Sequence, residues 1–115
     1  SMLIGAKHEL DNLVVLVDYN KIQALTTLDE GLPLEPLSAK FEAFNWECEE
    51  VMDGHSFDHL VPALEKANKY SKPKVLIVHT TKGKGVRDFE NDPGWHARKI
   101  KEEDLEIGKR ELDLL

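Results

Sequence analysis

The sequence predicts an α/β fold built on a short parallel sheet. Two apolar runs, Leu13–Val17 and Val75–Val78, have the length of buried strands, and each gives way abruptly to polar residues. Between the two runs lie two segments with helical spacing of apolar residues, separated by a short mixed stretch. This order of strand, helix, strand, helix, strand predicts about three parallel strands joined by right-handed crossovers, with flanking helices in a three-layer arrangement.

The helical segments follow from apolar spacing and capping residues. Residues 2–10 have helical spacing without a capping residue, so they read as the last part of a helix. A second helix is predicted over Glu35–Asn45, with Pro36 in its first turn. Ser56 can cap a third, whose apolar stripe is Phe57, Leu60, Val61, Leu64 and Ala67. A fourth is predicted over residues 101–114, although Gly108 weakens it by roughly 1 kcal/mol relative to Ala.

The remaining segments read as an edge strand and two loops. Trp46–Met52 is a short strand whose glutamates favour an edge or an end of the sheet. Residues 23–34 contain Thr, Gly and Pro and are predicted to form a loop. The segment 82–99 is polar and longer than most connections in a compact domain, so we expect a functional or flexible loop there.

Composition limits the classes of function. A chain of 115 residues forms one domain at most, and its net charge of −7 argues against a nucleic-acid or anionic-membrane surface. The single cysteine, Cys48, can form no internal disulfide, which favours a reducing compartment. No apolar run approaches the roughly 20 residues that cross a bilayer, and the start of the chain does not resemble a secretion signal. We therefore expect a cytoplasmic protein with no membrane or nucleic-acid partner.

Asn20 is the first candidate site residue. It follows the apolar run directly, and ligands of open α/β sheets bind at the carboxyl ends of strands. Its amide oxygen, together with a backbone carbonyl just beyond the strand, could ligate a hard cation such as Mg²⁺. The alternative is a turn, because Asp and Asn side chains often bond to nearby backbone, and the local pattern alone favours the turn.

Several short segments together resemble one enzyme family. In chain order they are Leu10–Leu13, Val17–Gln23, Lys40–Trp46, Asp53–His55, Thr81–Gly85 and Pro93–His96. Their order and spacing closely resemble the amino-terminal part of transketolases across nearly the whole chain. The resemblance identifies residues 2–115 as the carboxyl-terminal half of a thiamine-diphosphate-binding domain, with residues 82–99 as a flexible active-site loop.

The resemblance implies a cofactor and a metal. In transketolases an Mg²⁺ ion holds the diphosphate of thiamine diphosphate; Asn20 matches the asparagine that ligates it, and Ile22 matches the residue that offers its backbone carbonyl. The family also uses the aspartate of a Gly-Asp-Gly turn, and that tripeptide does not occur in this sequence. Losing the only anionic ligand is expected to remove much of the metal affinity.

The resemblance also implies roles for the second polar segment. His96 matches a histidine beside the diphosphate and the incoming sugar, where an imidazole can donate to phosphate or move a proton. The family usually has Gly at the next position, where this chain has Ala97. Lys82–Gly85 resembles the loop over the cofactor entrance, and a solvated basic turn is the alternative. His79 and His55 are expected to be structural.

The implied reaction is transfer of a two-carbon ketol unit between sugar phosphates. In this family a glutamate from a second domain also takes part, and the sequence contains neither that domain nor Gly-Asp-Gly. We therefore expect these 115 residues to be inactive alone and to self-associate or to bind a complementary transketolase subunit. Two alternatives stay open: a deoxyxylulose-phosphate-synthase-like fragment, and a non-catalytic protein-interaction module that keeps the fold.

Overall fold

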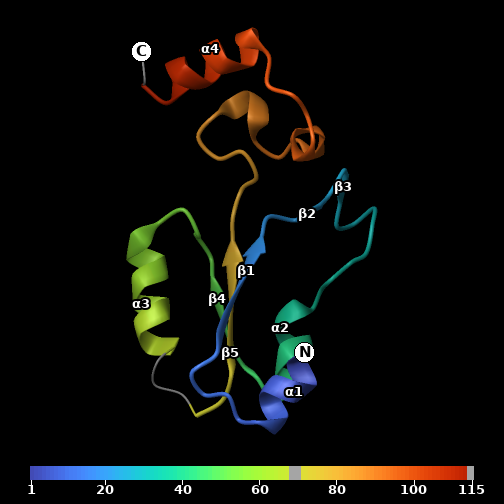
Figure 1. Cartoon of the computed structure of the whole chain (residues 1–115), viewed down its shortest axis with the longest axis vertical. Helices are drawn as coiled ribbons and strands as arrows, with labels where there is room; N and C mark the ends of the chain where they lie inside the picture. The colour runs from blue at the N-terminus through green and yellow to red at the C-terminus, as the bar shows by residue number, and fades with distance from the viewer. Residues whose placement is uncertain (68–70, 114–115) are drawn as a thin grey trace. The chain divides into compact units, whose positions relative to one another are not determined.

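The computed structural model describes residues 1–67 and 71–113, which form two compact units. The first unit comprises Ser1–Tyr19 and Leu34–Thr80, and the second comprises Asn20–Pro33 and Thr81–Leu115. Each unit brings together two stretches that are distant in sequence (Figure 1). The fold is therefore best followed one unit at a time.

The first unit contains the predicted parallel sheet. Its strand order is β1-β5-β4, with β1 at Val14–Tyr19, β5 at Lys74–His79 and β4 at Glu47–Val51. Both pairings are parallel, with β5 between the other two strands. The α/β class, the three-stranded sheet and the edge position of β4 in this sheet are confirmed.

Burial explains why β5 is central. Its residues from Lys74 to Val78 are all buried, as expected for a strand with neighbours on both sides and helices over both faces. Strand β1 is less covered, because Leu16 is 52% exposed at the edge of the described sheet. An apolar run indicates covered faces but does not show whether a strand has a neighbour on each side.

Helices lie on both sides of this sheet, which gives the predicted three layers. Figure 1 shows α3 (Phe57–Ala67) on one side and α1 (Met2–Lys7) and α2 (Leu37–Ala43) on the other. The sheet face toward α3 carries the main core, formed by Val51, Ala63, Leu76 and Val78 with Val14 and Leu60 against it. The helices occur where predicted, although α1 and α2 are shorter than expected.

The apolar stripe predicted for α3 is only partly correct. Ala63 and Ala67 are buried and Leu60 packs on the core, whereas Phe57, Val61 and Leu64 are exposed. The helix carries apolar residues over a wide arc, and the sheet covers only the side that holds the two alanines. Small side chains on that side allow close approach of helix and sheet.

The second unit contains a feature that the sequence pattern did not reveal. Part of the predicted loop over residues 23–34 is a hairpin of β2 (Ile22–Gln23) and β3 (Thr26–Thr27), paired antiparallel. Lys21 and Ala24 have φ values of 64° and 54°. A positive φ is unusual for Lys and Ala, so neither residue indicates a turn in the sequence.

The rest of the second unit consists of short turns and one helix. The predicted loop over residues 82–99 contains two 3-10 turns, η1 (Arg87–Phe89) and η2 (Pro93–His96). Helix α4 spans Glu102–Glu111, within the predicted 101–114; residue 114 lies outside the described residues. Among the helices of the described ranges, none has both the length and the apolar character of a bilayer span.

Candidate functional site

Asn20 closes a turn directly after β1. Its Oδ1 atom accepts a hydrogen bond of 2.9 Å from the backbone N–H of Ile22, and its side chain is half-buried. This is the side-chain-to-backbone turn that the local pattern favours. The bond also fixes the direction of the amide oxygen, which has a second lone pair available for another partner.

The carbonyl of Ile22 faces the same side as that amide oxygen. Lys21 accepts a hydrogen bond of 3.0 Å from the backbone N–H of Leu28, which makes those two residues a hydrogen-bonded pair of the hairpin. The next pair, Ile22 and Thr27, is then a non-hydrogen-bonded pair, whose N–H and C=O groups point away from the opposite strand. Because the N–H of Ile22 reaches Asn20, its C=O is directed toward that side too.

These two oxygens fit part of the coordination shell of a hard cation. Mg²⁺ prefers oxygen ligands and commonly takes one or two groups from the protein, with phosphate and water at its other positions. Both oxygens are neutral. Within residues 1–67 and 71–113, no cluster of three or more His, Cys, Asp or Glu side chains is arranged to hold a metal. The described residues thus offer at most two neutral oxygens at this turn and not a complete metal site.

His96 ends the 3-10 turn η2. Asp92 fixes the start of this turn, because its Oδ1 accepts a hydrogen bond of 2.8 Å from the N–H of Gly94. The side chain of His96 is exposed, and we find no hydrogen bond or ion pair to its imidazole from the described part of the chain. Ala97 has φ −144°, which alanine adopts without strain, so its presence in place of Gly is compatible with this turn.

The Lys82–Gly85 segment is a closed turn. Gly83 and Gly85 have φ values of 74° and 105°, and a Cβ atom on Gly83 would lie 2.3 Å from the carbonyl oxygen of Phe89. Glu90 accepts a hydrogen bond of 3.1 Å from the N–H of Gly85 and lies 3.6 Å from the ammonium of Lys84. An internal carboxylate thus occupies groups that an anion-binding loop would offer, in agreement with the absence of a phosphate-loop sequence.

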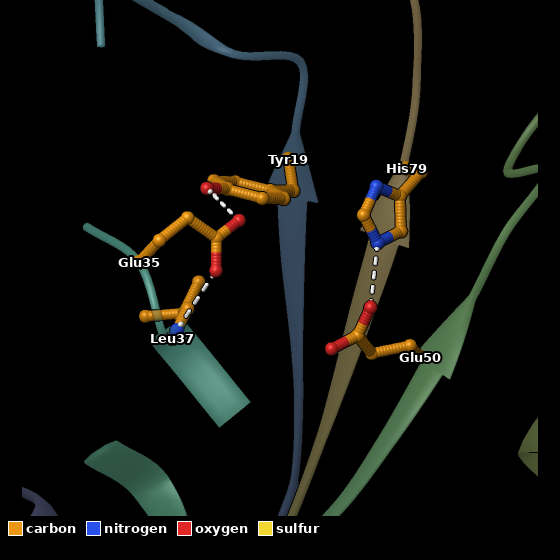
Figure 2. Close-up of polar contacts among 5 residues, drawn as sticks. All are labelled: Tyr19, Glu35, Leu37, Glu50 and His79. Carbon is orange, nitrogen blue, oxygen red and sulfur yellow. Dashed lines mark hydrogen bonds and ion pairs between the residues drawn. The ribbon is translucent and has the colours of Figure 1, made fainter. Parts of the chain in front are cut away.

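Polar side chains also meet at the carboxyl end of the sheet, and sequence reasoning missed most of them (Figure 2). The Tyr19 hydroxyl donates a 2.6 Å hydrogen bond to Oε1 of Glu35, whose Oε2 accepts from the N–H of Leu37 at 3.1 Å. His79 pairs with Glu50 at 3.0 Å, and its ring meets the Tyr19 ring edge-on at 5.5 Å. The expected structural role of His79 agrees with these contacts.

This group ties the end of β1 to the start of α2 and to its neighbouring strand. Glu35 connects the two because one carboxylate accepts from both Tyr19 and the first residue of α2. At the same end of the sheet, the Thr80 hydroxyl donates a hydrogen bond to the Asp18 carboxylate. The partners are far apart in sequence and lie outside any periodic pattern, so no local signal identifies them.

Comparison with known proteins decides the family. The family profile described as "Transketolase, thiamine diphosphate binding domain" matches residues 1–114. The chain belongs to the transketolase family. The sequence resemblance is thereby confirmed at the family level, and the assignment to the carboxyl-terminal half of the domain stays a prediction.

Several transketolase relatives are similar over nearly the whole chain. The 6-deoxy-6-sulfo-D-fructose transketolase subunit SqwG of a Clostridium species is 37% identical over 114 residues, which are 98% of this chain and 41% of that protein. One of the subunits of apulose-4-phosphate transketolase from Actinobacillus succinogenes is 36% identical over 110 residues, 96% of this chain and 40% of that protein. The chain therefore spans about 40% of the length of these subunits.

The fold agrees with solved transketolase structures. The crystal structure of transketolase from Campylobacter jejuni superposes with a TM-score of 0.89 at 28% identity, covering 97% of this chain and 17% of that one. The similarity of fold thus extends over nearly all of this transketolase-family chain.

Proposed function

We propose that the chain forms part of the cofactor-binding domain of a split transketolase, which transfers a two-carbon ketol unit between sugar phosphates with thiamine diphosphate and Mg²⁺. The observation that carries the proposal is that the Asn20 amide oxygen bonds to the Ile22 N–H on the outer side of the hairpin, the side to which the Ile22 carbonyl also points, within a chain that belongs to this family. Thiamine diphosphate, when bound, supplies the nucleophilic carbon of the reaction. The protein supplies binding, orientation and electrostatics.

In this proposal Asn20 and Ile22 hold the metal. Their two neutral oxygens take two positions of an octahedral ion and leave the others for diphosphate oxygens, water and ligands from elsewhere in the enzyme. The bond from the Ile22 N–H to Asn20 pre-orients the amide oxygen, so little side-chain freedom is lost when the ion binds. In this proposal the Asn20 amide oxygen therefore both closes the turn and binds the metal.

His96 is the proposed catalytic residue of this chain. An imidazole can donate to a phosphate oxygen or move a proton at the substrate. The ring is exposed, and the turn from which it projects is capped by Asp92, so the ring is accessible to a bound sugar phosphate. Sugar phosphates are the substrate class that the family match favours, and the choice among them is left open.

A complementary transketolase subunit is the proposed partner. The Clostridium and Actinobacillus relatives are each named as one subunit of a transketolase, and this chain spans about 40% of their length. We infer that the remaining ligands and catalytic groups come from other parts of the assembled enzyme. By themselves, the 115 residues are not expected to catalyse ketol transfer.

The metal proposal is tested by Asn20→Ala in the assembled enzyme. Loss of one of two protein oxygens should weaken Mg²⁺-dependent binding of thiamine diphosphate roughly tenfold to a hundredfold, the range seen when groups that support metal ligands are removed. Calorimetric titration of the cofactor at several Mg²⁺ concentrations measures this. Gln23→Ala is the matched control, because Gln23 is exposed and its side chain alternates to the other face from that of Ile22. Equal affinities for the two variants would rule out Asn20 as a ligand.

A further inference from the structure

A stack of side chains links His96 to the start of α4. The Trp95 ring lies against the Phe89 ring with centroids 4.0 Å apart, and the Arg98 guanidinium lies 4.2 Å from the centroid of the Trp95 ring. Arg98 also pairs with Oδ1 of Asp104 at 3.1 Å. The order Phe89, Trp95, Arg98, Asp104 is continuous, and all four residues belong to the second unit.

Both ends of this stack are fixed. Next to the Phe89 end, the Trp95 indole N–H donates a 3.2 Å hydrogen bond to the backbone carbonyl of Asp88. At the other end Asp104 is buried, and its Oδ2 accepts a 2.8 Å hydrogen bond from the backbone N–H of Lys101, next to the first turn of α4. One carboxylate therefore caps the helix and holds the guanidinium. Asp104 is thereby held in place, and Arg98 is restrained by this ion pair together with its stacking on Trp95.

His96 lies between the two stacked residues in sequence. A 3-10 turn of four residues is weak by itself, and η2 depends on contacts from outside. Asp92 secures its first residues, while Trp95 and Arg98 hold the chain on either side of His96. The side chains of Trp95 and Arg98 both take part in the stack, whereas the exposed imidazole of His96 is available to bind a ligand.

We propose that Arg98 is a positioning residue for His96. By stacking on Trp95 and pairing with Asp104, it fixes the backbone from which the imidazole projects, so that His96 reaches its ligand in one orientation. The proposal rests on the proposed function, in which His96 contacts the substrate. A displacement of about 1 Å at a reacting group can reduce a rate strongly, which is why a residue without substrate contact affects turnover.

The kinetic test uses Arg98→Ala in the assembled enzyme, with Lys99→Ala as the control. Lys99 is the next residue, is exposed and has the same charge, and it takes no part in the stack. We expect Arg98→Ala to lower kcat about threefold to tenfold, in line with the strength of a stacked guanidinium contact. Lys99→Ala should leave kcat unchanged. Arg98→Lys, which keeps the charge but not the planar group, should recover part of the loss and guards against misfolding of the alanine variant.

A double variant separates positioning from a general structural role. If Arg98 acts through His96, Arg98→Ala should add less than about a twofold loss in a His96→Gln background, because residues that act as one unit are not additive. An equal loss in both backgrounds would overturn the proposal. So would equal kcat values for Arg98→Ala and Lys99→Ala in an enzyme that His96→Gln does impair.

A spectroscopic measurement tests the role of Arg98 in the case that the proposed function is wrong. If His96→Gln leaves turnover unchanged, His96 is not catalytic, and positioning is judged from the NMR signals of ¹³C-labelled histidine. Arg98→Ala should then still shift the backbone carbonyl ¹³C signal of His96, because Arg98 fixes the backbone of this turn, and an unmoved signal would overturn the proposal. Fluorotryptophan signals give an internal control, because Trp95 should shift while the buried Trp46 should not.

Discussion

Two glycines illustrate how single residues control the stability of this chain. Gly54, in the turn after β4, lies so close to β5 that a Cβ atom would come within 2.3 Å of Cγ1 of Val78 and 3.0 Å of the His79 carbonyl oxygen. Its N–H also donates a 2.8 Å hydrogen bond to that carbonyl. Gly108, inside α4, has only Val86 Cγ2 near the same position, at 4.0 Å. The absence of a side chain at Gly54 thus allows this turn to pack closely against β5.

The two glycines should respond in opposite directions to alanine. Gly54→Ala is expected to lower the free energy of unfolding by about 1–3 kcal/mol, because the methyl group overpacks a core contact. Gly108→Ala should raise it by up to about 1 kcal/mol through helix propensity. Urea denaturation followed by circular dichroism measures both changes. A neutral Gly54→Ala would contradict the close approach of this turn to β5.

The thiol of Cys48 is a second case in which a single residue responds to its surroundings. Burial, with added repulsion from Glu42 and Glu50, raises the pKa of Cys48 from 9.0 to about 11. Cys48 is half-buried in the structure. The reactive thiolate should therefore be scarce at neutral and mildly basic pH.

Alkylation rates test this shift directly. At pH 8 the thiolate fraction should be roughly a hundredfold lower in the folded chain than in the urea-unfolded chain, since each pKa unit changes it about tenfold. Because the pKa of Cys48 is higher in the folded chain, the folded chain keeps the thiol proton between pH 9.0 and about 11, where the unfolded chain has lost it. The free energy of unfolding should therefore fall as the pH rises through that window. The second-order rate with iodoacetamide as a function of pH is the measurement. A midpoint near 9 in the folded chain would contradict the shift.

At the scale of elements, the important feature is the free edge of β1. This strand lies at one edge of the described sheet, and Leu16 is half exposed there. Strand β4 forms the other edge of the described sheet and carries Glu47, Glu49 and Glu50, and Glu49 pairs with Lys66 of α3 at 2.9 Å. Charged edges resist association, whereas apolar edges favour it. The two edges should therefore behave differently in solution.

The β1 edge should make the isolated 115-residue chain self-associate. Leu16→Lys places a charge on that edge and is expected to shift the chain toward the monomer in sedimentation velocity experiments. Leu32→Lys is the matched control, because Leu32 is 66% exposed and lies outside the sheet. If the wild-type chain is a stable monomer at tens of micromolar, or if both variants dissociate it equally, the edge of β1 is not the cause.

At the scale of the whole molecule, both metal ligands proposed for this chain, Asn20 and the Ile22 carbonyl, are neutral. The described residues hold no cluster of three or more acidic, His or Cys side chains suited to a metal, and the chain spans about 40% of the split subunits that it resembles. Mg²⁺ binding by protein groups usually involves at least one carboxylate. Cofactor binding should therefore require groups beyond those described in this chain.

The isolated chain is accordingly expected to bind thiamine diphosphate with Mg²⁺ more weakly than about 10 μM, a threshold that corresponds to roughly 7 kcal/mol. Isothermal titration of the 115-residue chain, repeated with the Asn20→Ala variant, measures this. Binding tighter than the threshold that disappears in Asn20→Ala would mean that the two oxygens suffice. That outcome would refute the expected need for an additional anionic ligand.

Much of the fold was predictable from the sequence because strands and helices depend on local periodicity. The runs Leu13–Val17 and Val75–Val78 indicated two strands, and Ser56 marked the start of α3 to within one residue. Asn20, Ile22 and His96 could be proposed because short segments around them resemble transketolases, and the family match supports that resemblance. These features depend on residues that are neighbours in the chain.

The tertiary structure decided contacts and directions that periodicity does not record, between residues both distant and near in sequence. It selected which side of α3 packs on the sheet, joined Tyr19 to Glu35, and turned the Ile22 carbonyl outward through a hairpin built on positive φ values. It also placed Arg98 on Trp95 and against Asp104. The physical reason is that periodicity records only whether a side chain is apolar, whereas partners and directions are set by the close packing of separate segments.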